Sequence, residues 1–246
     1  MKTLIKFILQ KVFGFKNYLF IFSLYINATL KGNRKEGDFL HFLSMLPENS
    51  TILDIGANIG VMTLHIARKL PGSQVFSFEP VPENLNNIHM LIKFFSIKNV
   101  SIFGIALGNY NGTAEIIMPE CNHVKFQGLS HIKGVEGSEG NSGVKYSVPI
   151  QKLDDLAELQ TPEKPVSGIK IDVENYEYNV LEGARNLLLK HKPVVYAELW
   201  ENQNRADCIR LLTDLGYSIF VLDKGVLVPF ESQKTQNFFF RLLPQS

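Results

Sequence analysis

Residues 51–70 read TILDIGANIGVMTLHIARKL, and this stretch decides the fold. Its first five residues form a short, mostly apolar run that ends at a glycine, which predicts a buried β-strand. From Val61 onward apolar residues recur at helical spacing, so a helix is expected directly after Gly60. A strand, a glycine turn and a helix in this order open a nucleotide-binding α/β sheet. Gly56 supplies a backbone conformation that other residues resist, and Gly60 permits close packing of the helix against the strand.

The residues beside the glycines indicate which ligand the turn accepts. A dinucleotide-binding turn has the pattern G-x-G-x-x-G, whose backbone N–H groups receive a pyrophosphate at the helix N-terminus. Here Asn58 takes the place of the middle glycine, and the carboxylate of Asp54 precedes the turn. That carboxylate repels phosphate and suits a cationic ligand with an amine. S-adenosylmethionine is such a ligand, because it carries a sulfonium and an ammonium group and no phosphate.

A second acidic residue follows the next apolar run. Residues 74–78 (QVFSF) predict another buried strand, and Glu79 and Pro80 come directly after it. Sheets of this kind place at this position the acid that holds the ribose hydroxyls, so Glu79 is our candidate for that role. The plainer alternative is that Asp54 and Glu79 only cap neighbouring helices. Two acids that each close an apolar strand favour the ligand-binding interpretation.

Four segments together resemble the FkbM-type S-adenosylmethionine-dependent methyltransferases. In chain order they are residues 53–60 (LDIGANIG), 78–84 (FEPVPEN), 106–112 (ALGNYNG) and 169–177 (IKIDVENYE), which are similar to the first motif, the second motif, the segment after the third strand and the late acidic motif. The resemblance covers roughly residues 36–200. The chain departs from the family at Asn175, where a glycine is usual. Asparagine adopts a left-handed backbone almost as readily, so the turn is expected to survive.

The resemblance implies which residues form the site. S-adenosylmethionine is expected to contact the glycine turn, the second acid with its proline, and two residues against the adenine ring: Asp54, Gly56, Ala57, Asn58, Gly60, Glu79, Pro80, Ala106 and Leu107. Ala106 and Leu107 equally fit simple strand-end packing. Asp54, Glu79, Asp172 and Glu198 all close predicted strands, so four acids are expected to ring one crevice.

Methyl transfer to a poorly acidic hydroxyl needs a base. The late motif offers Asp172 and Glu174 as candidate catalytic carboxylates, with Glu198 as a weaker candidate. The alternative for Glu174 is charge compensation at a helix N-terminus. Two carboxylates so close also suit a divalent cation, but no set of histidines accompanies them, and we predict no metal.

Composition narrows the class of protein. A chain of 246 residues with 45% hydrophobic content is expected to form one substantial core. The net charge of +1 gives no footprint for nucleic acid. Two cysteines without metal-ligand spacing, together with an N-terminus that lacks a clean cleavage site, predict a cytoplasmic protein.

The N-terminal region has its own chemistry. Residues 1–35 contain seven basic residues and no acid, and residues 3–13 show an amphipathic helical pattern. The uncharged run at 18–30 is shorter than the about 20 residues that cross a bilayer. This pattern predicts a helical extension over residues 1–46, and it suits peripheral contact of residues 1–35 with the inner membrane surface. We favour the plainer alternative, that the extension packs over the sheet or forms a homodimer contact.

The remaining residues 47–246 are predicted to form one methyltransferase domain. We expect a Rossmann-like α/β fold with a seven-stranded, mostly parallel sheet and an antiparallel pair at its C-terminal edge, because the last strands lack a crossover helix. A β-hairpin insertion is predicted at about 113–150, with a mobile crest over 121–142. Its histidines, His123 and His131, either face the acceptor or lie on the surface, and the surface is the plainer expectation.

Three functions remain from the sequence. The leading hypothesis, as the resemblance implies, is O-methylation of a hydroxyl on a sugar, glycan or natural product. A non-enzymatic alternative is a membrane-surface protein that keeps the nucleotide fold without turnover. An NAD-dependent oxidoreductase is disfavoured by Asp54 and Asn58.

Overall fold

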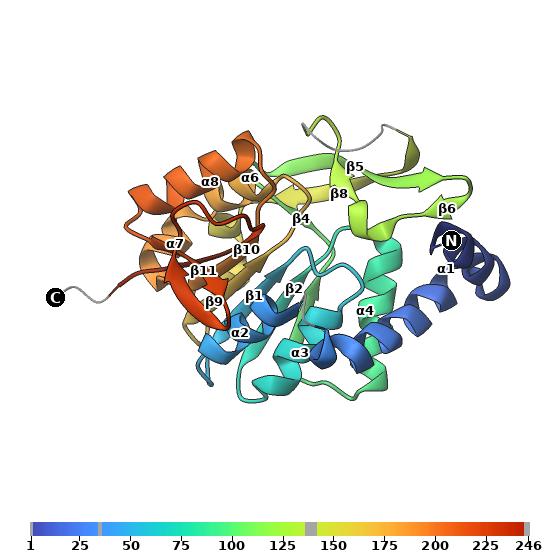
Figure 1. The fold of residues 1–246 in the computed structure, drawn as a ribbon, viewed down its shortest axis with the longest axis horizontal. Coiled ribbons are helices and arrows are strands. Elements are labelled where there is room, and N and C mark those ends of the chain that lie inside the picture. Colours follow the sequence, from blue (N-terminus) through green and yellow to red (C-terminus); the bar gives the residue numbers. More distant parts are fainter. Residues whose placement is uncertain (1, 34–35, 136–141, 244–246) are drawn as a thin grey trace.

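The computed structural model describes residues 2–33, 36–135 and 142–243 and arranges them around a central sheet (Figure 1). The strands of this sheet follow the order β12-β11-β13-β10-β9-β1-β2-β3. Their bounds are β1 Thr51–Ile55, β2 Gln74–Phe78, β3 Val100–Phe103, β9 Val166–Ile171, β10 Val194–Glu198, β11 Ser218–Asp223, β12 Val226–Pro229 and β13 Asn237–Arg241.

The strand directions confirm the predicted class of sheet. Strands β3, β2, β1, β9 and β10 are parallel, while β13 is antiparallel to both β10 and β11. The described sheet has eight strands and not seven, because β12 adds to β11 as the second strand of a hairpin. Lys224 and Gly225 both have positive φ between these strands, as a tight two-residue hairpin turn requires.

Helices cover both faces of the sheet. On one face lie α2 (Gly37–Met45), α3 (Val61–Lys69) and α4 (Pro82–Phe94), and on the other α6 (Glu177–Glu182), α7 (Arg185–His191) and α8 (Gln203–Asp214). Within β1, Ile52 packs in the cluster with α2 and α3, whereas Leu53 and Ile55 pack in the cluster with α6, α7 and α8. Since side chains alternate along a strand, the side chain of residue 54 is directed to the α3 face.

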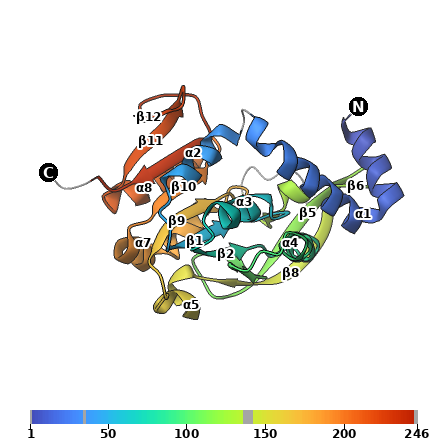
Figure 2. The ribbon, with the colours of Figure 1, turned by 90° about the horizontal axis from the view of Figure 1, so that it is seen from below.

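The N-terminal extension consists of α1 (Lys2–Thr29), the short η1 (Leu30–Gly32) and α2. Gly14 has non-helical φ and ψ of 70° and 155°, so α1 is two helical arms joined at a break. The second arm packs on α3 and α4, with the ring of Phe20 5.7 Å from that of Phe94. The first arm lies at the edge of the molecule beside β6 (Figures 1 and 2). Among the described residues, no helix has both the length and the apolar character that a membrane span needs.

The predicted hairpin insertion is present. Its long strands β5 (Gly112–Cys121) and β8 (Gly143–Gln151) pair antiparallel from Gly112↔Ile150 to Pro119↔Gly143. Smaller elements complete it: β4 (Ala106–Leu107), β6 (Val124–Lys125), η3 (Gln127–Leu129) and β7 (His131–Ile132). The segment η4 (Leu153–Asp155) and α5 (Ala157–Gln160) then lead back to β9. Part of the predicted crest, residues 136–141, lies outside the described residues.

Candidate active site

A cavity lies between the ends of β1, β2 and β9 and the insertion. Ligands of open α/β sheets bind at this place, outside the carboxyl ends of the strands. Eight of the eleven predicted site residues line it: Gly56, Asn58, Glu79, Pro80, Ala106, Leu107, Asp172 and Glu174. The insertion supplies the opposite wall with Ile116, Gln127, Gly128, Ser130, His131 and Ile132. The site is therefore a space between the sheet and a roof.

The glycine turn uses its backbone donors internally. The N–H groups of Gly56 and Ala57 both donate to the carbonyl of Phe78, at 3.1 and 3.0 Å. The N–H of Asn58 donates to Glu79 Oε2 at 2.8 Å, and that of Gly60 donates to the carbonyl of Ala57 at 2.8 Å. A dinucleotide site needs such donors for its pyrophosphate. This turn instead directs three of these donors to Phe78 and Glu79 and the fourth to its own Ala57, which argues against NAD.

Two positions of the turn require glycine, both because φ is positive and because a side chain would clash with neighbouring atoms. Gly56 has φ of 74°, and a Cβ there would lie 1.8 Å from the carbonyl oxygen of Asp172. Gly60 has φ of 84°, and a Cβ would lie 2.9 Å from a side-chain carbon of Ile88 on α4. The close approach at Gly60 is therefore between α3 and α4 and not, as the sequence suggested, between a helix and a strand. Gly60 and the buried Ala57 lie behind the cavity wall.

Glu79 stands one residue beyond β2 and faces the cavity. Its Oε1 accepts from the N–H of Val81 at 2.9 Å and from Asn84 Nδ2 at 3.2 Å, while Oε2 accepts from Asn58. Burial raises the pKa of Glu79 to about 7, although these three hydrogen bonds and the charge of Lys170 oppose the shift. A carboxylate has about four acceptor sites, so Glu79 keeps capacity for a ligand hydroxyl.

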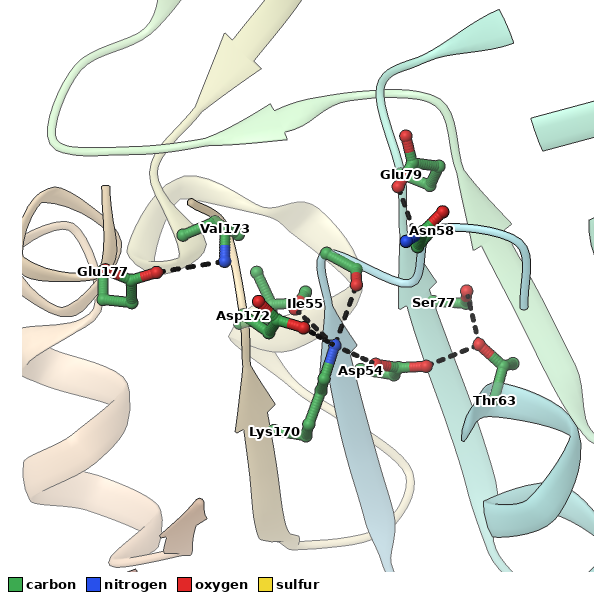
Figure 3. A network of polar contacts seen from close by, with 11 residues as sticks. Asp54, Ile55, Asn58, Thr63, Ser77, Glu79, Lys170, Asp172, Val173 and Glu177 are labelled. Carbon is green, nitrogen blue, oxygen red and sulfur yellow. Dashed lines mark hydrogen bonds and ion pairs between the residues drawn. The ribbon is translucent and has the colours of Figure 1, made fainter. Parts of the chain in front are cut away.

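Asp54 lies elsewhere than predicted. It is the fourth residue of β1, so strand alternation turns its fully buried side chain to the α3 face, and it does not line the cavity. Oδ2 accepts from Thr63 Oγ1 at 2.6 Å, and Oδ1 lies 3.4 Å from Lys170 Nζ. Figure 3 shows this network beneath the glycine turn. The expected direct contact between Asp54 and a cationic ligand is therefore absent from this geometry.

Lys170 is a functional candidate to which the sequence analysis gave no role. Its ammonium donates to the carbonyl of Gly56 at 2.8 Å and lies 3.7 Å from Asp172 Oδ2 (Figure 3). Burial alone lowers the pKa of Lys170, but the charges of Asp54 and Asp172 outweigh it and raise that pKa. The sequence does contain a signal for such a role, because Lys170 lies between two isoleucines in a strand that is covered on both faces. A charge buried in this way requires a partner.

The late motif forms a sharp turn after β9. Glu174 and Asn175 have φ of 55° and 69°, which confirms that Asn175 adopts the left-handed conformation expected of it. Glu177 stabilises the turn, because its Oε1 accepts a hydrogen bond from the N–H of Val173 at 3.1 Å. Its Oε2 accepts one from Asn204 Nδ2 at 2.5 Å. Burial, with the nearby charges of Asp172, Glu198 and Glu177, raises the pKa of Glu174 to about 8.

The predicted ring of four acids reduces to two at the cavity. Glu79 and Asp172 each stand one residue beyond a strand and line the wall. Asp54 and Glu198 lie within β1 and β10, and neither is part of it. Glu198 acts at a distance: burial and Asp172 raise its own pKa to about 7, and its charge raises the pKa of Glu174.

The roof contributes a histidine that the sequence placed at the surface. His131 is only 4% exposed and lines the cavity, whereas His123 is exposed as expected. His131 Nδ1 lies 3.0 Å from the carbonyl oxygen of Leu129. A carbonyl can only accept, so Nδ1 carries a proton, and in that tautomer Nε2 has the lone pair. That atom is buried with no partner among the described residues.

The unpartnered polar atoms test whether the site fits a donor-rich ligand. Asn84 Nδ2 is fixed by Glu79, which leaves Asn84 Oδ1 as a buried acceptor without a described partner. His131 Nε2 is a second such acceptor. An ammonium group, ribose hydroxyls and an adenine amine all supply donors, whereas a phosphate supplies acceptors. The residues present therefore fit S-adenosylmethionine.

A parallel sheet with an antiparallel β13, a glycine turn and an acid after β2 define a class of α/β enzyme that binds an adenosine ligand without phosphate. The chain matches the family described as the Methyltransferase FkbM domain over residues 54–219, and it belongs to this family. It is therefore a methyltransferase. Family membership also confirms the expected cofactor, S-adenosylmethionine.

Known proteins agree with this assignment. Methyltransferase sdnD of Sordaria araneosa is 27% identical over 204 residues, covering 74% of this chain and 79% of that protein. Methyltransferase 1 of Beauveria bassiana is 26% identical over 185 residues, covering 66% and 72%. The crystal structure of methyltransferase FkbM from Methylobacillus flagellatus shares the fold with a TM-score of 0.54 and 15% identity. That match covers 80% of this chain, which spans only 45% of the other.

Proposed function

We propose that this methyltransferase transfers the methyl group of S-adenosylmethionine to a hydroxyl oxygen of a sugar, glycan or natural product. The observation that carries the proposal is a base in the cavity wall opposite a second base in the roof. Glu174, with a pKa of about 8, and His131, with a free lone pair on Nε2, both line the same space. A base is needed when the acceptor is a poorly acidic hydroxyl.

Residues of the sheet are proposed to hold the cofactor. Glu79 accepts from the ribose hydroxyls, and Asn84 Oδ1 offers an acceptor beside it. Asn58 and Gly56 line the turn, while Ala106 and Leu107 supply an apolar wall for the adenine ring. Asp54 contributes indirectly, because it fixes Lys170, which binds the carbonyl of Gly56.

When bound, S-adenosylmethionine supplies a methyl group on a positively charged sulfur. The chain's part is to hold the acceptor oxygen in line with that methyl group, which contributes about 7–11 kcal/mol when orientation is good. A base of the protein would take the hydroxyl proton as the C–O bond forms and the S–CH₃ bond breaks, with the electron pair of that bond remaining on the sulfur. Residues of the insertion line one side of this space, and the lower dielectric beside them strengthens the electrostatic interactions of Asp172 and Glu174.

Asp172 and Glu174 are proposed to differ in role. Asp172 is 37% exposed and pairs with Lys170, so it is fixed and charged at the cavity edge. Glu174, with its pKa of about 8, is matched to receive a proton near neutral pH. Its ionised form grows as pH rises from 7 to 9, so methyl transfer is expected to rise over that window.

Carbon-13 methyl-labelled S-adenosylmethionine tests the proposal. The enzyme is incubated with a panel of hydroxylated sugars and natural products, and the product is examined by NMR, where a methyl ether has its own chemical shift. Glu174→Gln and Asp172→Asn are expected to bind S-adenosylhomocysteine but lower turnover by at least about 100-fold. A label that appears on nitrogen or carbon contradicts O-methylation, and full activity in both variants contradicts the assigned bases.

We further propose that the enzyme acts in the cytoplasm. Cys121 and Cys208 are both free, and Cys208 is buried on α8. Free thiols are usual where the environment is reducing. Fractionation of cells that express the tagged chain tests this location, and recovery from a secreted fraction contradicts it.

A further inference from the structure

The first arm of α1 carries an apolar stripe that points away from the protein. Four side chains recur at helical spacing on this face, and their exposed fractions are 51% for Ile5, 50% for Ile8, 37% for Leu9 and 69% for Val12. Phe13 extends the stripe at 43%. A helix that packs on its own domain buries such a stripe. This arm therefore shows its apolar face to the surroundings.

The opposite face of the arm is fixed to the insertion by polar contacts. Gln10 is 9% exposed, its Nε2 donates to the carbonyl of Lys125, and its Oε1 accepts from the N–H of Lys125, both at 3.1 Å. The ammonium of Lys6 lies 5.2 Å from the centre of the Phe126 ring. Rotation of the arm to bury its stripe would break all of these contacts. These contacts therefore keep the apolar stripe of the arm facing away from the protein.

Charge indicates what covers the stripe. Residues 1–35 carry seven basic side chains and no acid. Lys11 on the first arm and Lys16, two residues past the break at Gly14, are both exposed. An exposed apolar stripe flanked by lysines suits the headgroup region of an anionic bilayer. A second copy of the chain fits poorly, because two such arms would bring like charges together.

We propose that the first arm of α1 binds an anionic membrane surface through Ile5, Ile8, Leu9 and Val12. This inference goes beyond methyl transfer and depends on none of it. Phe126, which contacts the arm, is followed directly by Gln127 in the roof of the cavity. Membrane binding by the arm therefore places the roof of the cavity close to the bilayer surface.

Co-sedimentation with vesicles tests the proposal. The full chain is mixed with vesicles of phosphatidylcholine and phosphatidylglycerol, or of phosphatidylcholine alone. Binding is expected with the anionic vesicles and is expected to weaken at high salt. The double variant Ile8→Ser, Val12→Ser should bind about tenfold more weakly, and Lys11→Glu, Lys16→Glu should show a similar loss. Ile8 and Val12 are half exposed or more and both lysines are exposed, so folding is expected to be retained.

A matched control is available on the body of the protein. Leu189 and Val226 are 54% and 63% exposed but lie on α7 and β12, away from the arm. Leu189→Ser, Val226→Ser is expected to bind vesicles like the unchanged chain. Equal loss in both serine pairs overturns the proposal, as does binding that ignores lipid charge. Light scattering that shows a dimer dissociated by Ile8→Ser, Val12→Ser, without vesicle binding, also overturns it in favour of self-association.

Discussion

Asp54 and Glu79 close neighbouring apolar stretches of sequence, yet the structure uses them differently. Asp54 lies inside β1, fully buried against Lys170 and Thr63. Glu79 lies one residue past β2, where its backbone leaves the sheet and its carboxylate faces the cavity. A side chain within a strand is directed to a face of the sheet, whereas the residue after it lies at the sheet's edge. The position of an acid relative to the end of its strand therefore decides whether it stabilises the fold, as Asp54 does, or faces the cavity, as Glu79 does.

The largest expected effect comes from removing the partner of Asp54. Lys170→Met leaves the carboxylate of Asp54 buried without its cation, which should lower the free energy of unfolding by about 3–5 kcal/mol. Urea denaturation followed by circular dichroism measures this loss. The double variant Lys170→Met, Asp54→Asn removes both charges and should recover much of it.

A surface ion pair supplies the control for that experiment. Lys133 lies 3.0 Å from Glu115, and their side chains are 52% and 39% exposed. Lys133→Met should cost at most about 1 kcal/mol. If Lys170→Met lowers the free energy of unfolding no more than Lys133→Met does, the buried pair of Lys170 and Asp54 does not stabilise the glycine turn.

Replacing Glu79 and Asp54 one at a time by the corresponding amides is expected to separate an effect on ligand affinity from an effect on the stability of the fold. Glu79→Gln removes a charged acceptor of the ribose hydroxyls and should weaken S-adenosylhomocysteine binding about 10- to 100-fold. Asp54→Asn should change that affinity less than about threefold while lowering stability, because Asp54 does not line the cavity. Calorimetric titration of folded samples measures both. The reverse ranking would show that Asp54 reaches the ligand after all.

The pH dependence of binding sharpens the role of Glu79. Its pKa is about 7, so the carboxyl group is mostly protonated at pH 6 and mostly ionised at pH 8. Because the ionised form is the better acceptor for a ligand hydroxyl, affinity for S-adenosylhomocysteine should fall about tenfold from pH 8 to pH 6. Glu79→Gln should flatten this profile. A slope that persists in Glu79→Gln would assign the titration to another group.

The same raised pKa has an opposite effect on the stability of the free protein. A carboxyl group whose pKa is higher in the folded state than in the unfolded state favours folding when protonated. The stability that Glu79 contributes is therefore present below pH 4.5 and lost as pH rises through about 7. The thermal shift caused by S-adenosylhomocysteine should accordingly be larger at pH 8 than at pH 6.

The smallest expected effect lies at the edge of the Asp54 network. The hydroxyl of Thr63 donates its one proton to Asp54, so Ser77 Oγ must be the donor in the 3.1 Å contact between Ser77 and Thr63. Ser77→Ala removes this donor and leaves no buried N–H or O–H without a partner. We expect a loss of about 0.5–1 kcal/mol in unfolding free energy and unchanged ligand affinity. A larger loss would show that the network extends further into the sheet.

Local sequence patterns were sufficient to predict the elements of the sheet and the position of Glu79 at the cavity. The apolar runs at β1 and β2, the glycines and the missing crossover helix after β11 predicted the sheet class correctly. Periodicity also placed residues 54 and 79 next to the same crevice. It did not resolve strand ends to one residue, and this resolution decides which acid enters the cavity.

Contacts between distant segments were beyond the sequence argument. Lys170 meets Asp54 because β9 lies beside β1 in register, and strand order is a property of the whole chain. His131 was expected at the surface because residues 121–142 are rich in Gly, Ser and His. Instead β7 pairs with β5 and His131 lines the cavity as part of the roof, and nothing local in the sequence marks that pairing.

The pairing of Asp54 with Lys170 joins the first and late motifs of the chain across adjacent strands. Loss of one charge alone strands the other inside the protein, so evolution is expected to exchange the two together. Among distant relatives, aspartate and lysine at these positions should covary, with both present or both replaced by neutral side chains. A family signature that scores each motif separately would miss this dependence.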